Sequence, residues 1–186
     1  MKGYSLFVAP SPGTRAAYPY LQDLWDMGPT AVPYDNMHLV LLNVVPHIWK
    51  LFAWLKLVNK KADEDYIMPR ATVALVGREL RGARLTVPMA QARSLRNIEI
   101  HHSSFKAVDW LHLILCSGEV LLAGRIPNSY FNLFMALSRA CRMRFGPRGV
   151  TRAEIEEIDK EMKYFVPNYY AKIYRGTAER LPLCLS

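Results

Sequence analysis

Apolar residues recur with a helical period through most of the chain after residue 33. Residues 34–58 are mostly apolar, and four of their polar positions follow at steps of seven, four and three, which places them on one narrow stripe of a buried helix. Pro46 predicts a bend in this helix, because proline lacks a backbone N–H and clashes with the preceding turn. The residues of the stripe are Asn36, Asn43, His47 and Lys50.

Three helices are predicted in the middle of the chain, over residues 73–83, over residues 107–126 and from Ser129 onwards. The first is amphipathic, and the second is apolar almost all round, so it should be central to the core. Residues 86–105 mix arginines with isolated apolar residues, which predicts a short helix and a loop. The start and stop signals are Gly82 for the first helix, Ser103 or Ser104 and Pro127 for the second, and Ser129 for the third. The third helix should present Tyr130, Phe134, Leu137 and Cys141 on one face and Arg139 and Arg142 away from it.

The start of the last helix has the clearest local signal. Thr151 and Glu154 form a capping box, in which each side chain binds the backbone N–H of the other residue, and Val150 and Ile155 form a hydrophobic staple. An apolar stripe continues from there until Pro167 kinks or ends the helix. The residues of the stripe are Ile155, Ile158, Met162, Phe165 and Tyr169.

The predicted fold class is all-α, because no strand-like alternation bounded by hairpin turns occurs in the sequence. We expect an irregular helical bundle over residues 34–186, preceded by a proline-rich extended arm over residues 1–33. The arm is assigned from its prolines and glycines, which prevent long helices.

The composition is that of one globular domain with a large core or a partner-binding surface, since 51% of the 186 residues are apolar. The longest apolar run, residues 39–58, is interrupted by five polar or proline residues, so no membrane span is predicted. No secretory signal is evident, and three cysteines without CxxC spacing argue against a disulfide framework and a zinc site. We therefore expect an intracellular, reducing compartment.

The net charge of +8 is unevenly distributed. Between Arg70 and Lys106 there are seven basic residues and two acidic ones. Guanidinium groups bind phosphate oxygens bidentately, so such a surface suits nucleic acid, although the pattern is also typical of a solvated basic face. A second basic cluster comprises Arg139, Arg142, Arg144, Arg148 and Arg152.

Common nucleotide-binding, hydrolase and zinc-protease motifs do not occur in the sequence, and the pair Asp35 and His38 is the remaining candidate for chemistry. At helical spacing the two side chains share a face, where they could hold a divalent cation or position a phosphate. The structural alternative is an aspartate that caps a helix and a histidine that packs in the core.

The chain resembles the transposases of CACTA-type (En/Spm-like) DNA transposons, particularly the fungal branch. The resemblance rests on "PYDNMHLVLLNVVPHIWKLF", "VPMAQARSLRNI", "SFKAVDWLHLIL" followed by "RIP", and "YRGTAERLPLCLS". It covers nearly the whole chain but only a slice of the family's longer protein. Its most specific elements are D-x-M-H and K-A-x-D-W, of which the first lies, in the family, at the edge of an RNase H-like catalytic core.

The resemblance implies that Asp35 and His38 are close to the catalytic centre, with Asp35 as a Mg²⁺ ligand. Many relatives carry a glutamate just after the motif histidine, whereas this chain has four apolar residues there, so the chain should lack the full acidic triad. The resemblance also implies a structural or DNA-facing role for Lys106, Asp109 and Trp110.

Two hypotheses follow. In the first, the chain is a fragment of a DNA transposase in the nucleus, associated with DNA and with the rest of a transposase or its oligomer, and unable to cut DNA alone. In the second, it is a helical module that binds DNA or another protein and has no enzymatic role. Either way we expect no membrane and no small-molecule partner, and weak DNA binding without sequence preference. The expected DNA contacts are Arg93, Arg96, Lys106, Arg142 and Arg144.

Overall fold

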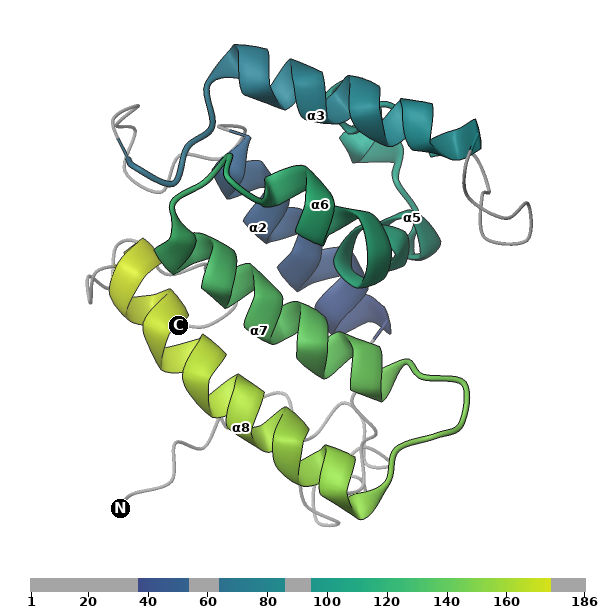
Figure 1. Cartoon of the computed structure of the whole chain (residues 1–186), viewed down its shortest axis with the longest axis vertical. Helices are drawn as coiled ribbons and strands as arrows, with labels where there is room; N and C mark the ends of the chain where they lie inside the picture. Colours follow the sequence, from purple (N-terminus) through teal and green to yellow (C-terminus); the bar gives the residue numbers. More distant parts are fainter. Residues whose placement is uncertain (1–36, 54–63, 86–94, 175–186) are drawn as a thin grey trace, which may run out of the picture. The chain divides into compact units, whose positions relative to one another are not determined.

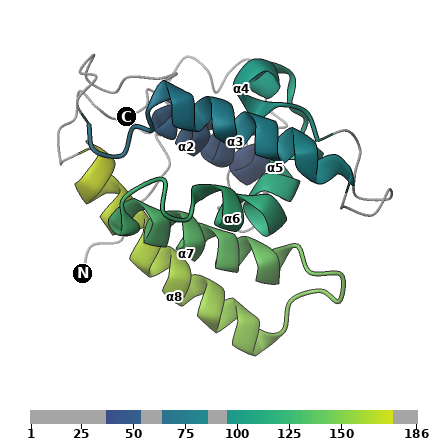
Figure 2. The same ribbon diagram turned by 45° about the horizontal axis from the view of Figure 1, so that its top comes forward.

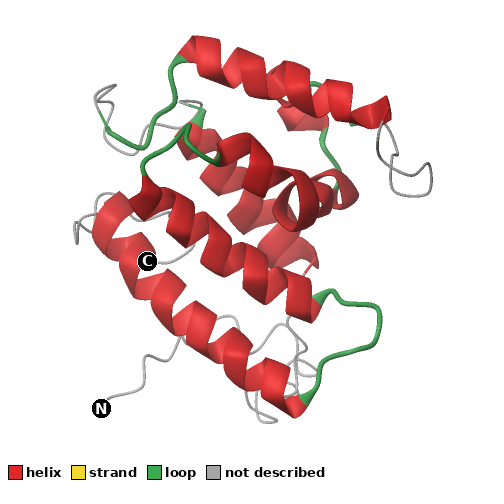
Figure 3. Ribbon diagram, viewed as in Figure 1, coloured by secondary structure: helices red, strands yellow, loops and turns green. Residues whose placement is uncertain are grey.

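The computed structural model describes residues 37–53, 64–85 and 95–174, all of which belong to one compact unit, Met37–Leu181. Within these ranges every regular element is helical and none is a strand (Figure 3), which confirms the all-α prediction. The predicted arm over residues 1–33 lies outside the described residues. None of the described helices is long and apolar enough to cross a membrane.

The helices include several short π-helical and 3-10 segments, labelled η, between and beside the α-helices (Figure 1). Their order is η1 (Met37–Val44), α2 (Val45–Phe52), α3 (Arg70–Gly82), η2 (Ala83–Leu85), α4 (Ile98–His101), η3 (His102–Ser104), α5 (Ala107–His112), η4 (Leu113–Ser117), α6 (Gly118–Leu122), α7 (Asn128–Arg144), α8 (Arg152–Tyr169) and η5 (Tyr170–Tyr174).

The described part of the first predicted helix consists of η1 and α2 and supplies much of the core. The wide turns of η1 end directly before Pro46, whose missing N–H interrupts the α-helical hydrogen-bond pattern. Trp49 and Leu51 are almost fully buried. On the polar stripe, His47 is half-buried and lies in hydrogen-bond distance of the Tyr174 hydroxyl, at 2.8 Å, which joins α2 to the end of η5.

The helix predicted over residues 107–126 is confirmed as a helical run without interruption from Ala107 to Leu122, in which the π-helical segment η4 lies between α5 and α6, but it ends four residues earlier than predicted. The hydroxyl of Ser138, on α7, donates a 2.6 Å hydrogen bond to the Ile114 carbonyl in η4. A side chain that takes a carbonyl in this way favours a local departure from the α-helical pattern. Lys106 caps α5 in place of either predicted serine, and its backbone N–H donates to the Asp109 carboxylate at 2.8 Å.

Helices α7 and α8 form an antiparallel pair with the most extensive helix–helix contact of the described unit (Figures 1 and 2). The predicted apolar face of α7 is buried, but the helix begins at Asn128, so Ser129 lies in its first turn and does not cap it. The capping box of α8 is confirmed, since the Thr151 backbone N–H donates to the Glu154 carboxylate at 2.8 Å.

The C-terminal part of α8 continues past Pro167 into η5, so the proline does not end the helix. Phe165 is buried, whereas Ile155, which was expected on the apolar stripe, is 57% exposed. Ile173 and Tyr174 in η5 are almost fully buried, and η5 therefore completes the core beside α2.

Helix α3 is confirmed as the amphipathic helix that ends at Gly82, with Val76 and Leu80 buried beneath it. It contacts α4 and α6 (Figure 2). The guanidinium of Arg125 makes two hydrogen bonds to the Glu79 carboxylate, at 2.7 and 2.8 Å, and so ties α3 to the turn that follows α6. These contacts hold α3 in place at the edge of the core.

Candidate functional site

A groove lined by basic residues lies between the C-terminal part of α3 and the segment that contains α4. It consists of two cavities of about 280 and 390 Å³, which share Arg81, Arg84 and Asn97. The smaller cavity is completed by Leu95, Arg96, Ile100 and His101, and the larger one by Arg78 and Gly82. We call this feature the basic groove, and no carboxylate is among the described residues that line it.

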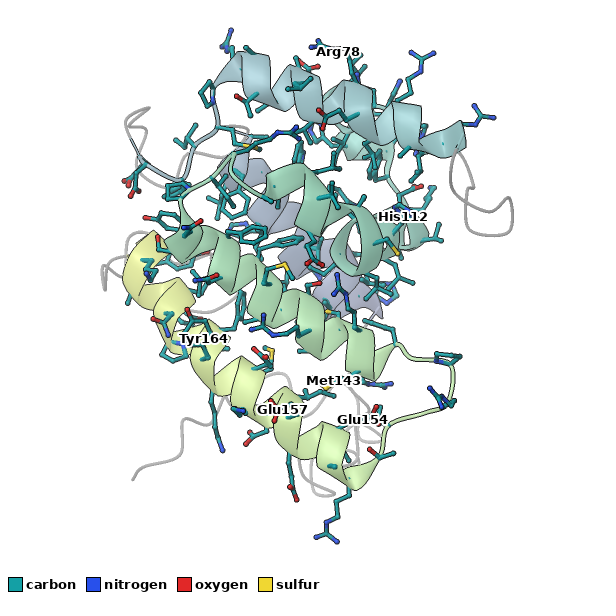
Figure 4. The ribbon with its side chains drawn as sticks, in the orientation of Figure 1. Arg78, His112, Met143, Glu154, Glu157 and Tyr164 are labelled. Atoms are coloured by element: carbon teal, nitrogen blue, oxygen red, sulfur yellow. The ribbon has the colours of Figure 1, made fainter. Side chains whose placement is uncertain are left out.

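Three arginines at every third position place their side chains on one side of α3 and η2. Arg78 points away from the helical core (Figure 4). The side chains of Arg78, Arg81 and Arg84 make no hydrogen bond or ion pair with any part of the chain that the structure describes. Their guanidinium donors are therefore available to an anionic ligand.

The distance between α3 and α4 depends on a glycine. A Cβ atom added at Gly77 would lie 2.1 Å from the Asn97 Oδ1 atom, closer than non-bonded atoms approach. The Asn97 side chain, which is packed at this point, accepts a 2.9 Å hydrogen bond from the Glu99 backbone N–H and caps α4. Gly77 thus allows the cap of α4 to rest directly on α3, which sets the floor of the basic groove.

Arg96 lines the same groove but its terminal nitrogens are engaged within the chain. They donate to the Ser104 hydroxyl at 3.0 Å and to the Ser104 carbonyl at 2.8 Å, and the Asp109 carboxylate is 3.5 Å away. The guanidinium also lies over the Phe105 ring. These contacts fix the orientation of Arg96 within the groove.

The motif K-A-x-D-W occupies the start of α5, where two of its residues have structural contacts. The Asp109 carboxylate accepts the hydrogen bond from the Lys106 backbone and faces Arg96, and the Trp110 side chain is buried against Phe105. The Lys106 side chain is exposed. Of the two charged side chains of this motif, that of Lys106 is the one exposed to a ligand.

The second basic cluster differs from the basic groove, because two of its arginines cross-link helices. Arg142 donates to the Glu119 carboxylate at 2.7 Å and to the Leu115 carbonyl at 3.0 Å. Arg139 pairs with Glu161, and this hydrogen bond is the main reason that the pKa of Arg139 is raised. Both side chains therefore join α7 to its neighbours.

The candidate catalytic pair is not brought together by the described residues, because Asp35 lies outside them, as does Arg93. His38 is exposed on η1, and its backbone carbonyl accepts a 2.7 Å hydrogen bond from the Asn43 side chain. In the described ranges there is no group of three His, Cys, Asp or Glu side chains that could hold a metal ion. The role of Asp35 and His38 stays a prediction.

A serine and an aspartate lie near His112, but they do not form a nucleophilic triad. The Ser117 hydroxyl is 3.3 Å from the His112 Nδ1 atom, and burial lowers the pKa of His112 against the opposing effect of Asp109 (Figure 4). The Asp109 carboxylate accepts from the Lys106 backbone and faces Arg96 instead. A triad needs an acid that orients the imidazole, and Asp109 does not have that position here.

Arg96 is the one groove residue that was among the DNA contacts expected from sequence. Arg78, Arg81 and Arg84 were missed, although the surplus of basic residues in that region was evident. The signal that could have found them is their spacing of three on the polar side of an amphipathic helix. Comparisons of the chain with protein-family models, with curated proteins and with solved structures give no match.

Proposed function

We propose that this domain binds DNA through the basic groove, by its phosphates and without regard to base sequence. The observation that carries the proposal is a set of three arginines, Arg78, Arg81 and Arg84, whose side chains have no partner among the described residues, on a groove with no carboxylate among its described lining residues. An arginine that already pairs with a carboxylate must give up that partner to bind a phosphate. The groove arginines have no such partner among the described residues, so the whole of their interaction energy with a phosphate contributes to binding.

DNA is proposed in preference to other polyanions because of the resemblance of the chain to CACTA-type transposases. On this proposal the chain is a DNA-associated piece of a nuclear transposase, and the basic groove holds a DNA strand beside the catalytic region of the parent protein. Asp35 would serve as one Mg²⁺ ligand there. A single carboxylate holds Mg²⁺ weakly, so the chain alone should not cut DNA.

The length of the arginine row sets the size of the expected contact. Six residues separate the first and third arginine, which at 1.5 Å per residue is about 9 Å along the helix. Three phosphate contacts on duplex DNA correspond to a slope of about −2.7 in a plot of log affinity against log salt concentration. Removing two of the arginines should reduce the magnitude of that slope by about 2.

The experiment is fluorescence anisotropy with a labelled duplex over a range of salt concentrations. The test variant is Arg81→Ala/Arg84→Ala, and the matched control is Arg148→Ala/Arg152→Ala, which removes the same charge from two exposed arginines near the start of α8. We expect the test variant to lose most of the affinity and the control to lose little. Equal losses in the two variants would show a diffuse basic face and contradict the groove, and salt-insensitive binding would favour a protein-docking module.

The transposase part of the proposal has a separate assay. Supercoiled plasmid is incubated with the protein in Mg²⁺ or Mn²⁺, beside Asp35→Ala and His38→Ala variants. We expect no nicking by any of the three proteins. Metal-dependent nicking by the parent chain that is lost in the Asp35→Ala variant would show that the chain carries a complete active site and contradict the proposal that it is an incomplete fragment.

A further inference from the structure

The basic groove combines arginines with side chains that suit a nucleic-acid base. The smaller of its two cavities is lined by the apolar side chains of Leu95 and Ile100 and by the imidazole of His101. Ile100 is 64% exposed and His101 is exposed as well, so both can contact a ligand. The larger cavity has no aromatic residue and is lined mainly by arginines.

We propose that the basic groove prefers single-stranded DNA, with a phosphate held by Arg81 and Arg84 and the attached base in the smaller cavity against His101 and Ile100. This inference rests on the proposed function and names the form of DNA that the groove accepts. The two arginines line both cavities, so a phosphate that they bind lies at the entrance to the base-binding cavity.

The preference for a single strand follows from which parts of DNA each form exposes. In a duplex the faces of the bases are stacked against one another, and a protein reaches only their edges in the grooves. In a single strand the face of a base is accessible, and it stacks on aromatic side chains, histidine included, or on arginine guanidinium planes. An exposed imidazole beside an exposed isoleucine offers a contact that only the single strand can use.

The position of Arg96 agrees with this arrangement. Its guanidinium lies over the Phe105 ring and is held by its hydrogen bonds to Ser104, and it lines the cavity that contains His101. A planar group fixed in this way loses little freedom when a base stacks on it. The smaller cavity therefore has two planar side chains and two apolar ones around a common space.

The experiment compares three labelled ligands of about 15 units, a length within the range of known single-strand sites. They are oligo(dT), a duplex of the same length, and an abasic strand that has the phosphates and sugars without bases. We expect oligo(dT) to bind more tightly than both the duplex and the abasic strand. A duplex that binds as tightly as oligo(dT) would overturn the preference for a single strand, and an abasic strand that binds as tightly would overturn the base contact.

The matched variants are His101→Ala and His102→Ala, of which only the first removes a residue that lines the groove. Stacking of one base predicts that His101→Ala lowers the ratio of oligo(dT) affinity to duplex affinity about fivefold, and that His102→Ala leaves this ratio unchanged. Equal loss for both ligands in the His101→Ala variant would overturn the inference while the proposed function stands. If the parent chain binds neither ligand at low salt, the proposed function itself is contradicted.

Discussion

The contact between α3 and α4 leads to a prediction about Gly77. We expect its replacement by alanine to lower the stability of the fold, whereas helix propensity alone would predict an increase. Replacement of Gly77 by alanine in the interior of α3 should gain about 1 kcal/mol if propensity alone mattered. The added Cβ would lie 2.1 Å from Asn97 Oδ1 and 2.9 Å from Asn97 Cγ. One of the two helices, or the Asn97 side chain, must therefore move.

The magnitude follows from what that movement costs. If Asn97 rotates away, the Glu99 backbone N–H loses its cap, which costs about 0.5–2 kcal/mol. Displacement of the packed neighbours adds about 1–3 kcal/mol. After the gain in propensity is subtracted, we expect a net loss of about 2 kcal/mol, which corresponds to a fall in melting temperature of about 4–8 °C for a chain of this size.

The assay is urea and thermal unfolding followed by circular dichroism, with Gly82→Ala as the matched control. Gly82 ends the same helix, and among the described residues no atom beyond its own helix turn and chain neighbours lies within 4 Å of the position of an added Cβ, so this variant should be as stable as the parent or slightly more stable. The Gly77→Ala variant should also bind DNA more weakly, because α4 forms one wall of the basic groove. Equal or greater stability of Gly77→Ala than of the parent would refute the close packing of Asn97 on α3.

Three other predictions concern the core, a cap and a thiol. Ser138→Ala leaves the buried Ile114 carbonyl without its hydrogen bond, so the free energy of unfolding in urea should fall by about 1–3 kcal/mol. The hydrogen bonds from Thr151 hold the pKa of Glu154 below its usual value. The Glu154 carboxylate therefore stabilises the fold at neutral pH, and this stabilisation is lost as the pH falls through the lowered pKa. The urea midpoint of the Glu154→Gln variant should depend less on acid pH than that of the parent. Burial raises the pKa of the Cys141 thiol to about 12, so mass spectrometry should detect alkylation at this residue only after unfolding.

The sequence by itself determined the features that depend on neighbours a few residues apart. Apolar positions at helical spacing located α3, α7 and α8, and the capping box of Thr151 and Glu154 was evident because its two partners are three residues apart. The basic character of residues 70–106 was evident as well. In each case the interacting groups lie on the same turn or the same helix, so their spacing in the chain is sufficient to predict them.

Only the tertiary structure decided which arginines are available to a ligand. Arg125 pairs with Glu79 across 46 residues and Arg142 with Glu119 across 23, whereas the side chains of Arg81 and Arg84 have no partner in the described part of the chain. The sequence does not distinguish these four arginines, because it gives their charge but not their partners. The packing of the helices determines which carboxylate lies beside each of them. The π-helical segment η4 has the same origin, since the hydroxyl that binds the Ile114 carbonyl comes from α7, 24 residues further along the chain.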